Sequence, residues 1–104
     1  MARKRIISQL KNFKRNLKKD MPDSRLILFG SQAWGKPHQD SDIDLIVISN
    51  TFKHKKSFER AVELYRLWNV RYPVDFICYT PQEFAKLSKM VTIAKEAAEK
   101  GIII

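Results

Sequence analysis

The chain has 104 residues, 44% of them hydrophobic and 30% charged, which suits one domain with a single core and is too short for two domains. The apolar runs at residues 26–29 and 45–48 are far too short to cross a membrane, and a single cysteine excludes an internal disulfide and a cysteine-based zinc site. We therefore expect one domain over residues 1–104, without a signal peptide and located in the reducing cytoplasm.

The net charge of +9 is concentrated at the start of the chain. Residues 3–19 hold eight lysines and arginines and no acid, so residues 1–20, which include Asp20, carry +7 and the other 84 residues only +2. A protein that binds nucleic acid over its whole surface would be basic throughout. We interpret the basic segment as the solvated face of a helix; contact with a nucleotide, RNA or an acidic partner is the alternative.

The first half of the chain predicts a helix followed by two strands. Residues 2–19 should form an amphipathic helix, because their apolar side chains recur every three or four residues. After a proline-containing loop, residues 25–29 predict a strand, and Ser31 can cap a short helix that extends to Trp34. Residues 42–48 become apolar on both faces, which predicts a central strand of a covered sheet. The apolar stripe of the first helix consists of Ile6, Leu10, Phe13 and Leu17.

The second half predicts a strand between two helical regions. Residues 56–70 should form a helix and residues 74–79 a strand. Residues 80–83 read Thr-Pro-Gln-Glu, a capping box that begins a helix, which we expect to break near Met90 and to end at Gly101. The last three residues would form a terminal strand or a hydrophobic tail. The order, roughly αβαβαβα, predicts an α/β fold with a small mixed β-sheet flanked by helices.

The helix over residues 56–70 has a wider apolar surface than packing on one sheet requires. Leu64, Leu67 and Trp68 extend this surface to more than half of the helix circumference. We therefore expect a docking or dimer surface around these three residues.

Two pairs of residues could together form a nucleotide and metal site. Asp42 and Asp44 project to the same face, because side chains alternate along a strand. Their repulsion raises their pKa values, and a divalent cation such as Mg²⁺ or Mn²⁺ would remove that cost. Gly30 and Ser31 lie between a strand and a helix, where the backbone and free N–H groups can approach a phosphate.

Asp75 is a third candidate, at the second position of the predicted strand 74–79. It can join the other two aspartates if its strand lies beside residues 42–48. Cys78 should face the opposite side of the sheet, as a small core residue. Each aspartate also has a structural alternative: Asp42 could cap a turn, Asp44 could pair with a lysine, and Asp75 could pair with a nearby arginine or lysine.

The combination of Gly30, Ser31, Asp42, Asp44 and Asp75 resembles the minimal nucleotidyltransferases of the DNA polymerase β superfamily, including antitoxin members of that family. In these proteins Gly-Ser is followed after ten residues by Asp-x-Asp and later by an aspartate on another strand, as it is here. The resemblance covers residues 25–80. It implies the polymerase-β-like nucleotidyltransferase fold for the whole chain.

The resemblance also implies a two-metal reaction. Asp42, Asp44 and Asp75 would hold two Mg²⁺ ions, with Mn²⁺ as an alternative, while Gly30 and Ser31 would hold the β- and γ-phosphates of ATP. The nucleoside monophosphate, AMP in that case, would pass to a hydroxyl group with release of pyrophosphate.

Trp34 departs from the family pattern, which often has an arginine at this position. Lys36 or the basic first helix would then have to supply the positive charge for the triphosphate. The departure favours an alternative function, a non-catalytic antitoxin or binding module that neutralises a partner by association.

The partner is also an implication of the resemblance. Related proteins are often encoded beside a HEPN-domain toxin, which they are thought to adenylylate on a hydroxyl side chain. A chain of 104 residues has no room for a separate acceptor-binding domain, so another macromolecule must present the acceptor. A homodimer remains an expectation, no membrane contact is expected, and direct binding of nucleic acid is left open as a third interpretation.

Overall fold

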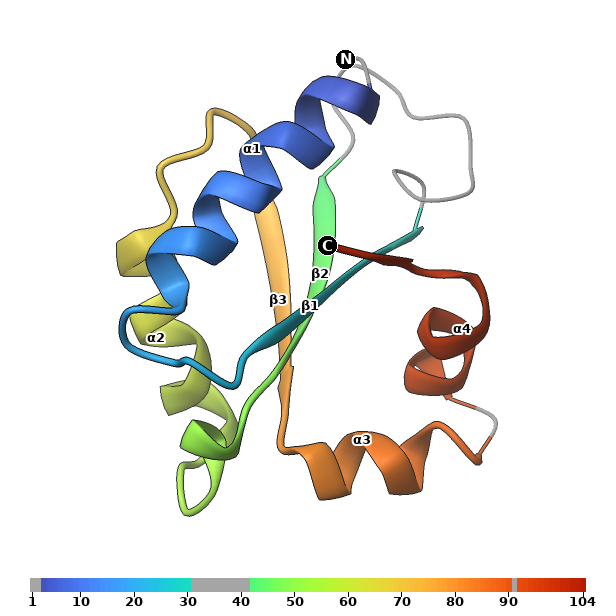
Figure 1. Cartoon of the computed structure of the whole chain (residues 1–104). Coiled ribbons are helices and arrows are strands. Elements are labelled where there is room, and N and C mark those ends of the chain that lie inside the picture. Colours follow the sequence, from blue (N-terminus) through green and yellow to red (C-terminus); the bar gives the residue numbers. More distant parts are fainter. Residues whose placement is uncertain (1–2, 31–41, 91) are drawn as a thin grey trace.

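The computed structural model describes residues 3–30, 42–90 and 92–104. These residues form a four-stranded mixed sheet with strand order β3-β2-β1-β4, and helices cover both of its faces (Figure 1). The strands are β1 (Arg25–Phe29), β2 (Ile43–Ile48), β3 (Val74–Tyr79) and β4 (Ile102–Ile103). The predicted α/β class and the small mixed sheet are therefore confirmed.

Strand β2 lies at the centre of the sheet. It pairs antiparallel with β1 over residues 44–48 and parallel with β3 along its whole length. The parallel pair is possible because the segment between β2 and β3 is long enough to carry a crossover helix. β4 pairs antiparallel with β1 at only two positions, so the last residues form a strand rather than a free tail. The predicted central position of residues 42–48 is confirmed.

Helix α1 (Arg3–Leu17) packs on one face of the sheet through a single apolar stripe. Its four stripe residues are essentially inaccessible to solvent, as the spacing predicts. Burial of four large apolar side chains anchors the helix, at about 1.5–3 kcal/mol each. The four are Ile6, Leu10, Phe13 and Leu17.

Helix α2 (Ser57–Leu67) lies on the same face and corrects one expectation. Leu64 is fully buried, and Leu67 and Trp68 pack against the core. The expected docking surface around these three residues is therefore wrong. The physical reason is that α2 contacts both the sheet and α1, so two arcs of its circumference are covered. Its exposed apolar side chains are Phe58, Val62 and Tyr65.

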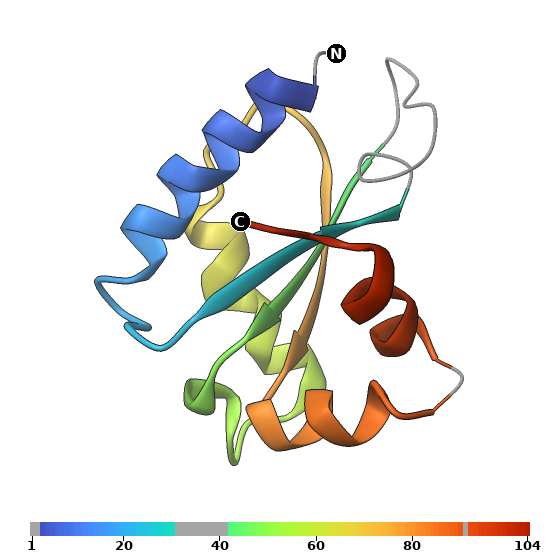
Figure 2. The same cartoon turned by 45° about the vertical axis from the view of Figure 1, so that its right-hand side comes forward.

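The opposite face of the sheet carries α3 (Pro81–Leu87) and α4 (Ile93–Lys100), separated as predicted near residue 90 (Figure 2). The capping box is present: the Thr80 hydroxyl accepts a hydrogen bond from the Glu83 backbone N–H, and the Glu83 carboxylate accepts one from that of Thr80. Gly101 ends α4 in an extended conformation. A side chain there would collide with the Ala97 carbonyl and with Ile27, so close approach, rather than left-handed geometry, explains this glycine.

No helix within the described residues combines the length and the apolar character needed to span a bilayer. The short helix expected from Ser31 to Trp34 lies outside the described residues.

Candidate active site

The sheet brings two of the predicted aspartates side by side. Asp44 on β2 is the register partner of Asp75 on β3, and neighbouring strands are about 4.8 Å apart. Asp42 lies just before β2, two residues from Asp44, where alternation places its side chain on the same side of the sheet. The condition under which Asp75 can join the other two aspartates is therefore met, because its strand pairs with β2.

The three carboxylates lie at the open end of one sheet face. That face carries a small apolar cluster with α3 and α4, which includes Ile46 on β2 and Ile77 on β3. Asp44 and Asp75 come two residues earlier on the same strands, and therefore on the same face. Asp44 is half-buried, whereas Asp42 and Asp75 are exposed. The arrangement leaves the carboxylates accessible from solvent.

The electrostatic environment of Asp44 opposes its ionisation. Burial raises the pKa of this carboxyl above its ordinary value, and the negative charges of Asp75 and then Asp42 raise it further. The two ion pairs between described residues, Arg60–Glu83 and Arg66–Glu63, involve none of these aspartates. A structural role through a lysine or arginine partner therefore has no support within the described part of the chain.

Gly30 lies directly against the carboxylate of Asp44. Phe29, the residue before it, is the register partner of Asp44 on β1. Gly30 has a left-handed backbone with φ +77°, and a Cβ at this position would overlap Asp44 Oδ2 and lie 3.3 Å from Asp44 Cγ. The structure shows a close approach of the Gly30 backbone to Asp44, and the phosphate contact of Gly30 stays a prediction from the sequence.

Several predicted site residues cannot be placed. Ser31 and Lys36, predicted to bind phosphate, and Trp34, which replaces the expected arginine, lie outside the described residues. Their roles stay predictions from the sequence.

The donor set has the chemistry that a hard divalent cation requires. Three carboxylates lie at one end of the sheet, and the charges of Asp75 and Asp42 add to burial in raising the pKa of Asp44. In the arrangement of the described residues, no three acidic, histidine or cysteine side chains are close enough to form a ready-made metal cluster. The site is a set of suitable oxygen donors rather than a closed cage.

Cys78 has no place in this site. It faces the other side of the sheet from Asp75 and packs against the core, as the alternation predicts. Burial raises its pKa to about 12, so the thiolate required of a nucleophile is not populated near neutral pH.

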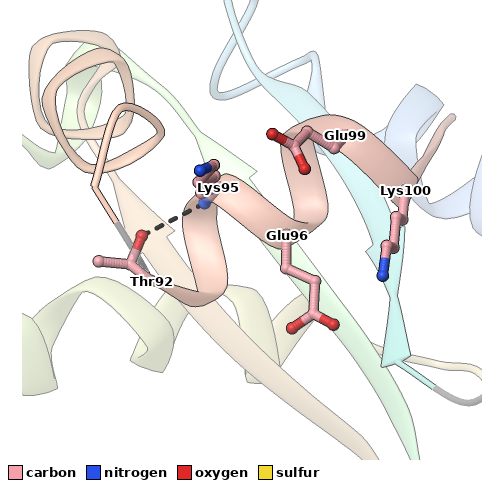
Figure 3. A pocket seen from close by; sticks show the side chains of 5 residues that line it. All are labelled: Thr92, Lys95, Glu96, Glu99 and Lys100. Carbon is pink, nitrogen blue, oxygen red and sulfur yellow. Dashed lines mark hydrogen bonds between the residues drawn. The ribbon is translucent and has the colours of Figure 1, made fainter.

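Two surface hollows in the described structure lie away from the aspartates. One, of about 270 Å³, is formed by side chains of both charges on α4 and by Thr92, whose hydroxyl accepts the Lys95 backbone N–H (Figure 3). The other, of about 130 Å³, lies between α1 and the segment after α2. The first is lined by Thr92, Lys95, Glu96, Glu99 and Lys100, and the second by Gln9, Asn12, Asn69 and Val70.

Comparisons with known proteins bear on the family of this chain and on its fold. The sequence model of the family described as "Nucleotidyltransferase domain" matches residues 10–104. A curated relative from Methanocaldococcus jannaschii, "Putative protein adenylyltransferase MJ0141", is 27% identical over 71 residues, which are 66% of this chain and 72% of the relative.

Two solved structures share the fold. A crystal structure titled as a putative nucleotidyltransferase from Sulfolobus solfataricus superposes with a TM-score of 0.69 at 22% identity, over 97% of this chain and 80% of the other. A second crystal structure, also titled as a putative nucleotidyltransferase, has a TM-score of 0.53 at 30% identity, over 77% of this chain and 86% of the other.

Proposed function

The chain belongs to the nucleotidyltransferase domain family, and on this premise we propose that it transfers a nucleoside monophosphate, AMP from ATP, to a hydroxyl group on a partner macromolecule. Its fold is the polymerase-β-like nucleotidyltransferase fold that the resemblance implies. Nucleotidyl transfer is the general function; the nucleotide, the metal and the acceptor are parts of the proposal.

One observation carries the proposal: the register that places Asp44 beside Asp75 at the open end of a sheet face. A stable fold does not need three carboxylates there, because their repulsion and the burial of Asp44 oppose ionisation. The arrangement costs stability unless a cation or a cationic ligand compensates it, which is typical of a functional site.

We assign the following roles to the residues. Asp42 and Asp44 would together hold two Mg²⁺ or Mn²⁺ ions. Asp75 would complete the ligand set of one of these two ions. Bound there, divalent cations supply positive charge that offsets the charge on a triphosphate and favours ionisation of the attacking hydroxyl. Asp75 is exposed, so its carboxylate is available to accept the proton of the acceptor hydroxyl when the new bond to the α-phosphorus forms and pyrophosphate leaves.

The phosphate contacts are assigned to the segment that starts at Gly30. Gly30 leaves room for the Asp44 carboxylate, and Ser31 and Lys36 follow it in the sequence. Ser31 would donate to the β- or γ-phosphate, and Lys36 would supply the positive charge that the family often takes from an arginine. These two roles rest on the sequence.

The acceptor is proposed to be presented by another molecule. A protein acceptor is supported by the relative whose name gives it as a protein adenylyltransferase. A HEPN-domain toxin encoded beside this protein, in a toxin–antitoxin pair, is the specific candidate. Homodimerisation stays a prediction, which light scattering after size-exclusion chromatography tests.

The experiment that tests the function measures label transfer from [α-³²P]ATP in the presence of Mg²⁺ and the product of the neighbouring gene. Asp42→Asn and Asp44→Asn should each lower the rate by about 100-fold or more, because each removes charge from the site of phosphoryl chemistry. Asp20→Asn is the matched control, since Asp20 is an exposed aspartate beyond the end of α1, and should leave the rate unchanged. Transfer at the normal rate in Asp44→Asn would overturn the site assignment.

A second readout is independent of activity. Mg²⁺ should raise the melting temperature of the wild-type protein and of Asp20→Asn, because it relieves the repulsion on Asp44, and EDTA should reverse the effect. Asp44→Asn should lose most of this shift. An equal shift in all three proteins would place the cation elsewhere.

The second candidate function is the non-catalytic module, which the sequence feature Trp34 favours. It predicts that the partner binds equally well to wild type and to the Asp42→Asn/Asp44→Asn double variant, with no label transferred by either protein.

A further inference from the structure

The outward side of α1 carries a row of cations that form no ion pair with any residue that the structure describes. Six exposed lysines and arginines lie on α1 and directly after it, and the sequence of the helix contains no acid. Both ion pairs of the described residues lie elsewhere, on α2 and α3. Positive charge on this surface is therefore available to an external anion. We call it the basic face; it consists of Lys4, Arg5, Lys11, Arg15, Lys18 and Lys19.

The basic face lacks the features of a protein-docking surface. The exposed large apolar side chains of the described structure are Phe58, Val62, Tyr65, Met90 and Ile103, and these lie outside α1. The exposed uncharged residues of α1 that lie among these cations are Ser8, Asn12 and Asn16. Protein interfaces have apolar centres and are depleted in lysine, whereas nucleic-acid interfaces are polar and positively charged. Hydroxyl, amide and cationic groups together are the usual ligands of backbone phosphates.

The row is rigid and has the length of a short nucleic-acid segment. The buried stripe of α1 fixes the helix on the core, so the cations project from a fixed scaffold. The 15 residues of α1 extend about 22 Å at 1.5 Å per residue. In one strand of a duplex, successive phosphates are about 3.4 Å apart along the helix axis. The basic face is therefore about as long as a segment of six phosphates.

The position of α1 relates the basic face to the carboxylate site. In both views the first turn of α1 lies at the same end of the sheet as the starts of β2 and β3 (Figures 1 and 2). Lys4 and Arg5 belong to that turn, and Asp42 and Asp75 belong to those strand starts. A chain bound along α1 therefore extends towards the end of the molecule that holds the aspartates, whose side chains lie on the opposite face of the sheet from α1.

We propose that the basic face binds the sugar–phosphate backbone of a nucleic acid without regard to base sequence. Backbone contacts carry no sequence information, and the exposed positions of α1 include no aromatic side chain on which bases could stack. The surface shares no residue with the aspartate site, so this inference holds whether or not the proposed transfer reaction is correct.

The test compares two triple variants with the same net charge. Lys11→Gln/Arg15→Gln/Lys18→Gln removes three charges from the basic face, and Lys53→Gln/Lys86→Gln/Lys89→Gln removes three exposed lysines elsewhere. Fluorescence anisotropy with labelled 20-nucleotide RNA, single-stranded DNA and duplex DNA measures the affinity of each protein at several salt concentrations. Circular dichroism confirms that both variants are folded.

The basic-face variant should lose at least about tenfold in affinity at low salt. Since three phosphate contacts are lost, the slope of log K against log salt should become less steep, by about 2 for single strands and by about 3 for duplex DNA. The control variant should keep the slope of the wild type. Binding of RNA, DNA or both supports the proposal and identifies the source of the backbone.

Three results would overturn the inference: no binding by the wild type at 50 mM salt, equal losses in both triple variants, or displacement of RNA by polyglutamate at equal charge. The Asp42→Asn/Asp44→Asn variant should bind as the wild type does, which separates failure of this inference from failure of the proposed catalysis.

Discussion

The contact between Gly30 and Asp44 is the most specific single-residue feature of the site. Asp44 is half-buried at the second position of the central strand, and its carboxylate occupies the space that a side chain at residue 30 would need. Gly30 also adopts a left-handed backbone that other residues reach only with strain. This glycine therefore determines where the central carboxylate can lie.

Replacement of Gly30 by alanine should affect both stability and activity. We expect Gly30→Ala to lower the free energy of unfolding by about 1–3 kcal/mol, because the left-handed backbone is strained for alanine and the new Cβ collides with Asp44 Oδ2. Urea unfolding measures the loss. Label transfer per folded molecule should fall as well, because Asp44 must move.

A double variant separates the two causes of that loss. Gly30→Ala in an Asp44→Ala background keeps the backbone strain but removes the collision, so the cost of the glycine replacement should be smaller there. The control is Gly101→Ala, which collides with the Ala97 carbonyl. It should destabilise the protein without lowering transfer per folded molecule. Additive effects of Gly30→Ala and Asp44→Ala would refute the close contact.

At the scale of elements, Arg60 joins three of them at the end of the sheet opposite the aspartates. From α2, its guanidinium donates to the Cys78 carbonyl on β3 at 3.2 Å and to Glu83 Oε1 on α3 at 2.6 Å. Glu83 also accepts the Thr80 backbone N–H at 2.8 Å. One arginine and one capping glutamate thus fix the orientation of α3 relative to β3 and α2.

This link makes part of the stability depend on pH. The hydrogen bond from Arg60, followed by that from Thr80, holds the pKa of Glu83 below its ordinary value of 4.5. The ionised carboxylate therefore stabilises the fold above pH 4.5, and this contribution is lost as the pH falls through the lowered pKa.

Glu83→Gln should destabilise the protein by up to about 1 kcal/mol at pH 7, since glutamine keeps the capping geometry but not the charge. The difference from wild type should shrink below pH 4.5, as urea unfolding at a series of pH values would show. Glu63→Gln, which removes the exposed partner of Arg66, is the control and should give a small difference. A loss for Glu83→Gln that does not change with pH would contradict the assignment.

We expect opposite effects on stability from apolar substitutions on the buried side of α2, where Phe13 of α1 packs, and on its exposed side, where Phe58 lies. Phe13 of α1 contacts the rings of Trp68, just after α2, and Phe76, at centroid distances of 5.1 and 5.8 Å, whereas Phe58 is 72% exposed. Phe13→Ala should cost about 3–5 kcal/mol through lost burial and a cavity. Phe58→Ala should change stability by less than about 0.5 kcal/mol. Similar losses in urea unfolding for both variants would show that the exposed side of α2 is covered.

At the scale of the whole molecule, the sheet order makes β2 the structural centre. Its backbone is paired on both sides along its length, whereas β4 meets β1 at two positions only. Opening of β2 requires disruption of both helical layers. We therefore expect its amides to exchange hydrogen most slowly and those of β4 fastest among the strands. Hydrogen exchange followed by mass spectrometry measures this order, and faster exchange in β2 than in β3 would contradict it.

The sequence by itself determined the elements and the alternation of their side chains. The strands over residues 25–29 and 74–79, the stripe of α1 and the capping box at Thr80 were predictable, because each depends on local spacing and on neighbouring backbone groups. The same alternation placed Asp42 and Asp44 on one face, and the family resemblance added Asp75 to them. The side of α2 that remains exposed could not be predicted, because it depends on the packing of α2 against α1 as well as against the sheet.

Only the tertiary structure decided how these elements meet. The parallel pairing that makes Asp44 and Asp75 neighbours, the contact of Gly30 with Asp44, and the link from Arg60 to Glu83 across three elements join residues that are distant in the chain. Local patterns specify which face of an element is apolar. Strand order, register and helix contacts arise from how those faces pack together, and these long-range contacts place the side chains of the candidate site.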